Sequence, residues 1–276
     1  MKINRMNNTI LLHHLGYADL FSCNGLVNYY SETRENIKIL VDTHDKKEIL
    51  DYMYSHLPQV SCELPEISIE KNLDETCLKC HTSNQMGKCP RGYEYCSYVN
   101  WSKYQHDEII KVGAFHEYNS WENFRKNEEN ISFSHSFYTY NKIDIENRIN
   151  KFAINRNKLR EEQIFQNYTE LNGSEYSVIH EDHKRHIIID RIYIKTENIY
   201  NLDSKSKIFL DQIGIIENAS ELHFIDSSYS VLIYFLSFYS EKIKNIPKYL
   251  HLYTRNSRDY NIYKNPTPEN WYNIYE

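Results

Sequence analysis

The sequence predicts an α/β protein made of two Rossmann-like domains, and two observations support this. Near the N-terminus, the short apolar run of residues 10–12 is followed by a turn at Gly16 and by apolar residues at helical spacing up to Tyr30. A second apolar run, residues 37–42, begins within the length of one right-handed crossover. Apolar runs and helical segments alternate again in the second half of the chain, which indicates a second parallel sheet.

The first half is predicted to continue this alternation. Gly16 can adopt a positive φ in the first turn, and one helix is expected to extend from about Asp19 to Tyr30. The later elements expected in this half are a helix at residues 46–54, strands at 60–64 and 109–115, and a helix at 120–125.

The second half is predicted to begin with a helix and to alternate from there. Strands are expected at residues 175–180, 186–190, 221–226 and 248–253, and helices at 158–168, 209–219 and 231–239. Pro266, Pro268 and Trp271 are expected in a short tail after the last strand.

The composition excludes several classes of function. The chain has 276 residues and a net charge of -6, which gives no electrostatic footprint for nucleic acid. No apolar run approaches the roughly 20 residues of a membrane-spanning helix, and the polar N-terminus is unlike a secretory signal. We therefore expect an intracellular protein without a transmembrane segment and without a nucleic-acid partner.

Four of the six cysteines fall in one loop-rich segment: Cys77, Cys80, Cys89 and Cys96. In a reducing compartment this density favours a metal over disulfides. Tetrahedral zinc needs two ligands from one tight turn, and the spacing of Cys77 and Cys80 supplies such a pair. The other two cysteines are spaced more widely, so two disulfides and four free thiols stay as alternatives to structural zinc.

A longer motif covers the first turn and helix: His-Leu-Gly-Tyr-Ala-Asp-Leu-Phe-Ser-Cys-Asn-Gly-Leu-Val, residues 14–27. It resembles the opening of a group of GT-B glycosyltransferase-like proteins, many of them from large DNA viruses and bacteria. It is also distantly similar to the heptosyltransferases. Ala18 stands where these families usually have glycine, whereas Asp19 matches the acid that is the catalytic base of the heptosyltransferases.

This resemblance implies a GT-B-like architecture, in which two Rossmann-like domains face each other across a cleft. It implies a boundary near residue 157, with an acceptor-side domain at 1–157 and a nucleotide-sugar-binding domain at 158–276. The families have no counterpart of the cysteine segment. Residues 65–105, approximately, are therefore expected to form an insertion outside the active site.

Asp19 is the candidate catalytic base in the resembling pattern. A sugar hydroxyl is a weak nucleophile until a carboxylate accepts its proton, and Asp19 would supply that carboxylate. The alternative is an acid that only stabilises the start of a helix. His13 and His14 follow the first apolar run directly and are candidates for the acceptor side.

Three donor-binding candidates lie where a predicted strand meets a helix: Asp226, Ser227 and Ser228. Backbone N–H groups and the dipole at a helix N-terminus bind anions. In the resembling families a similar element faces the diphosphate of the donor, although Tyr229 departs from their pattern. The alternative is a serine that only caps the helix.

The remaining donor-binding candidates are His180, Lys184 and Arg185, which follow the first strand of the second half. The resembling proteins have a His-Asp-Asp-like stretch and an arginine in this place. Lysine and arginine neutralise phosphate, and arginine binds it with two hydrogen bonds. The alternative is a solvated, charged loop.

These features predict a glycosyltransferase that moves a sugar from a nucleotide-sugar donor to a glycan or another hydroxyl acceptor. Cationic side chains and helix N-termini stabilise a leaving diphosphate, so no catalytic metal is expected; structural zinc is the one further cofactor considered. The alternatives are an inactive GT-B-like binding or scaffold protein with a zinc-stabilised contact loop, and a zinc-dependent regulatory module. The expected location is the cytoplasm, that of the host if the chain is viral.

Overall fold

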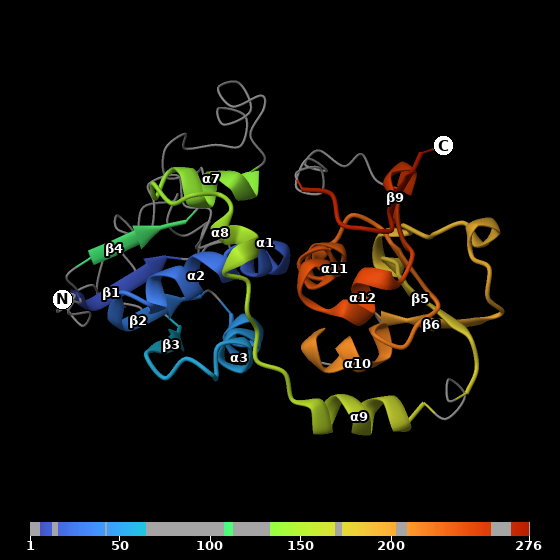
Figure 1. Ribbon diagram of the computed structural model, residues 1–276, viewed down its shortest axis with the longest axis horizontal. Helices are drawn as coiled ribbons and strands as arrows, with labels where there is room; N and C mark the ends of the chain where they lie inside the picture. The colour runs from blue at the N-terminus through green and yellow to red at the C-terminus, as the bar shows by residue number, and fades with distance from the viewer. Residues whose placement is uncertain are drawn as a thin grey trace, which may run out of the picture. The chain divides into compact units, whose positions relative to one another are not determined.

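The chain divides into two compact units, each with one wholly parallel sheet (Figure 1). The computed structural model describes residues 6–12, 16–41, 43–64, 108–112, 133–168, 173–202, 209–254 and 266–275. The units are Met1–Asn155 and Arg156–Glu276. Every pair of neighbouring strands is parallel, which confirms the predicted α/β class.

The first sheet has the strand order β3-β2-β1-β4. Its strands are β1 (Met6–Leu12), β2 (Arg34–Leu40), β3 (Val60–Glu63) and β4 (Glu108–Lys111). Apolar side chains such as Leu11 and Ile39 are fully buried, as expected for a parallel sheet covered on both faces. The four apolar runs predicted in this half are therefore strands, although the first two begin several residues earlier than expected.

The helix expected after the first strand is instead two helices, α1 (Tyr17–Ser22) and α2 (Asn24–Ser31). In an unbroken helix, the Leu26 N–H would donate to the Ser22 carbonyl oxygen. The hydroxyl of Tyr138 lies between these two groups, accepting from Leu26 N at 3.1 Å and donating to Ser22 O at 2.8 Å. A side chain inserted into the hydrogen-bond ladder is a recognised cause of helix kinks, and here it explains the break at Cys23.

Gly16 does not adopt the positive φ expected for it, because its φ and ψ are -70° and 176°. This extended conformation is the one a helix N-cap normally has. Gly16 caps α1, and its own N–H donates to the Asp19 carboxylate at 3.1 Å. The turn therefore depends on this hydrogen bond and not on left-handed backbone.

Residues 133–155, which we call the arm, follow the first sheet and contain the helices α7 (Phe133–Thr139) and α8 (Asn147–Asn150). α8 packs on α2, and Tyr138 of α7 is hydrogen-bonded to Leu26 of α2. Asn24 fixes the end of the arm by a pair of hydrogen bonds with the Ala153 backbone, at 2.8 and 2.9 Å. α8 lies so close to Gly25 that a Cβ atom there would be 2.3 Å from the Asn147 carbonyl oxygen. The helix α3 (His44–Met53) completes the described helices of this unit.

The second sheet has the order β6-β5-β7-β8-β9. Its strands are β5 (Tyr176–His180), β6 (Asn198–Asn201), β7 (Glu221–Phe224), β8 (Lys248–His251) and β9 (Trp271–Ile274). The predictions of β5, β7 and β8 are confirmed. β6 was not predicted, and the expected tail at Trp271 is wrong because this residue begins the edge strand β9.

The strand predicted at residues 186–190 is also wrong. This stretch lies between two short 3-10 turns, η5 (His183–Arg185) and η6 (Arg191–Tyr193). The buried carboxylate of Glu181 accepts from the Ile189 N–H at 2.7 Å and from the Arg191 guanidinium at 2.6 and 2.9 Å. The Ile189 N–H is therefore bonded to Glu181 and cannot pair with a neighbouring strand. The Ile189 side chain still packs into an apolar cluster.

The second unit contains helices α9 (Lys158–Gln166), α10 (Ile213–Ile216), α11 (Ser228–Tyr239) and α12 (Glu241–Asn245). The helix predicted at residues 209–219 is shorter, because a 3-10 turn, η8 (Phe209–Gln212), precedes the single turn of α10. A further 3-10 turn, η9 (Leu252–Thr254), follows β8. α11 is buried from Tyr229 to Ser237, so it forms the centre of this unit's helical layer.

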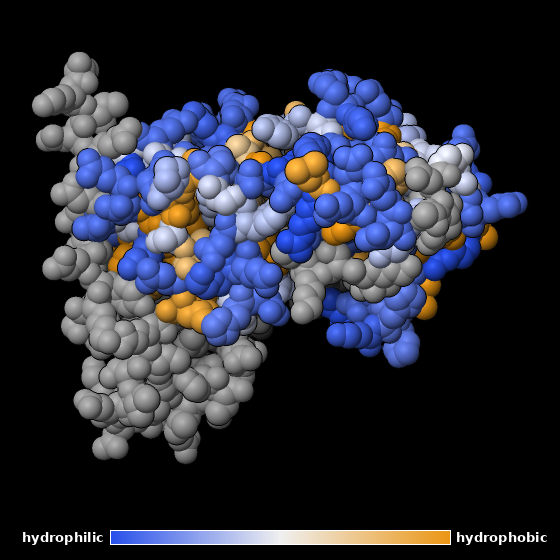
Figure 2. Space-filling model, turned by 90° about the horizontal axis from the view of Figure 1, so that it is seen from below, coloured by the Kyte–Doolittle hydropathy of each residue, from blue (hydrophilic) through white to orange (hydrophobic). Residues whose placement is uncertain are grey.

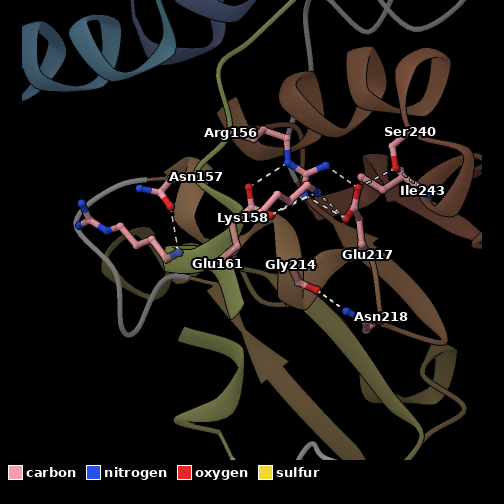
Figure 3. Close-up of polar contacts among 10 residues, drawn as sticks. Arg156, Asn157, Lys158, Glu161, Gly214, Glu217, Asn218, Ser240 and Ile243 are labelled. Atoms are coloured by element: carbon pink, nitrogen blue, oxygen red, sulfur yellow. Dashed lines mark hydrogen bonds and ion pairs between the residues drawn. The ribbon is translucent and has the colours of Figure 1, made fainter. Parts of the chain in front are cut away.

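A buried ion-pair network fixes the start of the second unit (Figure 3). The Arg156 guanidinium donates to Glu161 at 2.8 Å and to Glu217 at 2.5 and 2.9 Å. Glu217 also accepts from the Ser240 hydroxyl at 2.8 Å. The network therefore joins α9 to the segments around α10 and α12.

The visible face in Figure 2 is mostly hydrophilic, with hydrophobic residues in separate patches. Among the described residues, no helix combines the length and the apolar character needed to cross a bilayer.

Candidate functional site

Asp19 occupies the first turn of α1, just beyond the carboxyl end of β1. In parallel α/β sheets, this edge is where ligands bind. The side chain is half-buried, and one carboxylate oxygen accepts from Gly16 N–H at 3.1 Å. The Asp19 N–H in turn donates to the Gly16 carbonyl oxygen at 3.1 Å. This reciprocal pair holds the carboxylate in one orientation at the start of the helix.

Burial raises the pKa of Asp19 to about 7, because loss of water disfavours the carboxylate. The Gly16 N–H and the positive charge of Lys46 oppose this rise without cancelling it. A base is most effective when its pKa lies near the working pH. Asp19 is therefore a carboxyl group that can accept and release a proton near neutral pH.

Two groups of predicted site residues lie outside the described residues. They are the acceptor-side candidates His13 and His14, and the zinc candidates Cys77, Cys80, Cys89 and Cys96. Within the part of the chain that the structure describes, no cluster of three or more His, Cys, Asp or Glu side chains has the arrangement of a metal site.

The N-terminus of α11 lies beyond the carboxyl end of β7, as predicted. Ser227 is its N-cap: the Ser227 hydroxyl accepts from Ser230 N–H at 3.4 Å, and the Ser227 N–H donates to the Ser230 hydroxyl at 2.9 Å. Ser227 therefore caps α11, and its hydroxyl proton can still be donated to a ligand. Ser228 is the first residue of the helix, and Asp226 lies just before the cap; both are half-buried.

His180 ends β5, the strand next to β7, and lies beside the start of α11. Its ring centroid is 4.6 Å from that of Tyr229, and its carbonyl oxygen accepts from Ile225 N–H at 3.3 Å. The structure therefore brings His180 together with the segment that contains Asp226, Ser227 and Ser228.

Lys184 and Arg185 are exposed in the turn η5, after β5. The Arg185 guanidinium pairs with Asp182, and its side chain is 60% exposed. A solvent-exposed ion pair of this kind contributes only about 0–1 kcal/mol. A phosphate would therefore compete easily with Asp182 for Arg185.

A buried polar chain beneath His180 was not predicted. The Tyr229 hydroxyl accepts a hydrogen bond from the Gln212 side-chain amide nitrogen at 2.9 Å, and the Gln212 side-chain amide oxygen accepts from the Tyr200 hydroxyl at 3.4 Å. These residues come from α11, η8 and β6, so their separation in sequence hides the contact. A polar glutamine directly before an apolar helix was the only available signal.

Comparisons with known proteins give no family. No family model matches the chain, and no curated protein matches it. A glycosyl transferase family 9 structure from Veillonella parvula shares 8% identity at a TM-score of 0.45, over 91% of this chain and 81% of that one. The iron-containing dodecameric glycosyltransferase TibC from enterotoxigenic E. coli shares 12% identity at a TM-score of 0.45, over 91% of this chain and 59% of that one. Neither likeness is close enough to decide an activity for this chain.

Proposed function

We propose that this protein is a glycosyltransferase that transfers a sugar from a nucleotide-sugar donor to a hydroxyl group of a glycan or another acceptor. The observation that carries the proposal is Asp19, whose pKa is raised to about 7 at the carboxyl end of β1. An acid that served only to stabilise α1 would be most effective as a fully ionised carboxylate. A pKa near neutrality is instead suited to proton transfer.

In this proposal the second domain binds the donor at the start of α11. The N–H groups of its first turn, the hydroxyls of Ser227 and Ser228, and Arg185 would hold the diphosphate. His180, whose ring contacts that of Tyr229, would lie beside the bound donor. As the bond from the anomeric carbon to the diphosphate breaks, these groups would stabilise the departing negative charge.

The first domain would supply the acceptor side. Asp19 takes the proton from the acceptor hydroxyl while the oxygen attacks the anomeric carbon. His13 and His14 are the proposed acceptor contacts. The reaction requires Asp19 in its ionised form, so kcat/KM should rise as the pH increases through about 7.

Donor binding by the full chain tests the first part of the proposal. Thermal shift and calorimetry against nucleoside diphosphates and nucleotide sugars should identify one preferred donor. Arg185→Ala should weaken that binding by roughly 1.5–3 kcal/mol, as expected for a charge-assisted hydrogen bond. Lys242→Ala, which removes an exposed cation from α12, is the matched control and should leave the affinity unchanged.

Asp19→Asn tests the base, because the amide keeps the shape but cannot accept the proton. Turnover should fall by roughly 10²-fold or more, whereas donor affinity should stay near that of the parent. Asp45→Asn is the control, since Asp45 is also an acid in a first helical turn, that of α3. Transfer at the parental rate by Asp19→Asn would show that another group is the base. Absence of any nucleotide binding would favour the scaffold alternative.

The cysteine segment is proposed to hold one structural zinc ion. Elemental analysis of the purified protein should find about one zinc per chain, and Cys77→Ser should abolish its binding. Parental zinc content in that variant, or none in the parent, would contradict the proposal.

A further inference from the structure

Tyr138 separates the helix that carries Asp19 from the helix that follows it. Its hydroxyl accepts from Leu26 N–H at 3.1 Å and donates to Ser22 O at 2.8 Å. The ring is completely buried, and the hydroxyl and Leu26 N–H meet away from water. Both bonds therefore form where an unsatisfied backbone group is costly.

We propose that Tyr138 is a positioning residue for Asp19, an inference that rests on the proposed role of Asp19 as the base. Without the Tyr138 hydroxyl, Leu26 N–H and Ser22 O are the natural partners of one another in a continuous helix. Closing that bond would align α1 with α2. Asp19 lies three residues before Ser22 in α1, so it would turn with that helix out of the surroundings that bury it.

The chemical state of Tyr138 suits this role. Burial raises the pKa of its hydroxyl well above the ordinary value, and the nearby Cys23 acts in the same direction. Tyr138 therefore keeps its proton through the neutral range in which Asp19 titrates, and there it donates to Ser22 O. The break between α1 and α2 is consequently fixed and does not titrate with Asp19.

The arm that contains Tyr138 is itself held in place by contacts with α2. Tyr138 belongs to α7, at the start of the arm, and the other end of the arm is held to α2 by the Asn24–Ala153 hydrogen bonds. Lys151 adds an ion pair with Glu32 just after α2, at 2.5 Å. The arm is thus bonded to α2 and to the residue after it at several points, and Tyr138 of the arm determines the direction of α1.

The test compares Tyr138→Phe with Tyr54→Phe. Tyr54 is also a buried tyrosine of the first unit, and its hydroxyl bonds to the Asn24 side chain, whereas the Ser22 and Leu26 backbone groups are bonded by Tyr138. The Asp19-linked titration is measured as the difference in unfolding free energy between each protein and its Asp19→Asn counterpart, from pH 4 to 9. This difference needs no enzymatic activity, so a failure of the proposed function and a failure of the positioning role are distinguishable.

In the parent, this difference should fall as the pH rises from about 3.8, where the unfolded chain releases the proton, and should level off near pH 7, where folded Asp19 releases it. The pH at which it levels off is the titration midpoint compared between variants. Tyr138→Phe should move it by about one pH unit or more toward the ordinary 3.8, and kcat/KM against pH should shift with it. Tyr54→Phe should change stability without moving the midpoint. An unmoved midpoint in Tyr138→Phe would overturn the proposal. If that variant does not fold, 3-fluorotyrosine at position 138 keeps the ring and weakens the acceptor; a midpoint identical to the parent's would overturn the proposal equally.

Discussion

Replacing Gly25 by alanine should be among the most damaging small substitutions in the first unit. An added Cβ would lie 2.3 Å from the Asn147 carbonyl oxygen and 3.0 Å from the Arg148 Cα, and both are backbone atoms of α8. α8 must then move away from α2. Such a shift also strains the hydrogen bonds of Asn24 to Ala153, at 2.8 and 2.9 Å.

The expected change in the free energy of unfolding combines two costs and one gain. Overpacking costs roughly 1–3 kcal/mol, and each weakened hydrogen bond costs about 0.5–1.5 kcal/mol. Alanine has a helix propensity about 1 kcal/mol better than that of glycine, which offsets part of this loss. Gly25→Ala should therefore lower the free energy of unfolding by about 2–4 kcal/mol.

Urea unfolding of the full chain, followed by circular dichroism, measures this change. Two other glycines provide a graded comparison. A Cβ at Gly16 would meet only an Asp19 oxygen at 3.8 Å, and one at Gly214 would lie 3.2 Å from the Glu161 Cβ. The loss should increase in the order Gly16, Gly214, Gly25. If Gly25→Ala unfolds at the same urea concentration as Gly16→Ala, the close approach of α8 is refuted.

Two further predictions concern acid stability. Burial opposes ionisation of Glu217, but its hydrogen bonds with Arg156 and Ser240 outweigh this effect and lower its pKa from 4.5 to about 2. The contribution of the Glu217 carboxylate to the free energy of unfolding should be complete above pH 4.5 and lost as the pH falls toward 2. Arg156→Met leaves the carboxylates of Glu161 and Glu217 without this partner and should lower the free energy of unfolding by about 3–5 kcal/mol at pH 7. Burial and the neighbouring His223 lower the pKa of His251 from 6.5 to about 4, so protonation destabilises the fold as the pH falls between these values. His251→Gln should flatten this part of a stability-against-pH curve, and an unchanged curve would contradict the assignment.

The strands that the sequence predicted correctly are those whose own side chains form the core. Leu11, Ile39 and Leu222 are completely buried, and central parallel strands are therefore visible as short apolar runs. The errors arose where a distant contact decides the backbone. Residues 186–190 are as apolar as a strand, but the buried Glu181 carboxylate captures the Ile189 N–H. β9 is a four-residue edge strand, and nothing in its sequence marks the pairing of Trp271 with Lys248.

In the candidate site too, some features follow from the local sequence and one depends on a distant residue. The place of Asp19 after β1 and of Ser227 before α11 follows from local pattern, because strand ends and helix starts are both visible in the sequence. The break between α1 and α2 is not local, since Tyr138 lies 112 residues from Leu26. Neither helix carries a proline at the break, and Cys23, the N-cap of α2, makes no side-chain capping bond.

The opening motif, residues 14–27, contains two parts with different physical reasons. Its second part is explained by packing alone: Asn24 bonds to the Ala153 backbone, and Gly25 leaves room for α8. Docking of the arm thus accounts for these two residues in this chain, whatever it catalyses. Gly16 and Asp19 form the first part, and the hydrogen bond from Gly16 N–H to the Asp19 carboxylate shapes the turn. A carboxylate that only shaped the turn would not need a pKa of about 7 at the edge of a sheet. Within the motif, catalysis is therefore supported by Asp19, and Asn24 and Gly25 add nothing to it.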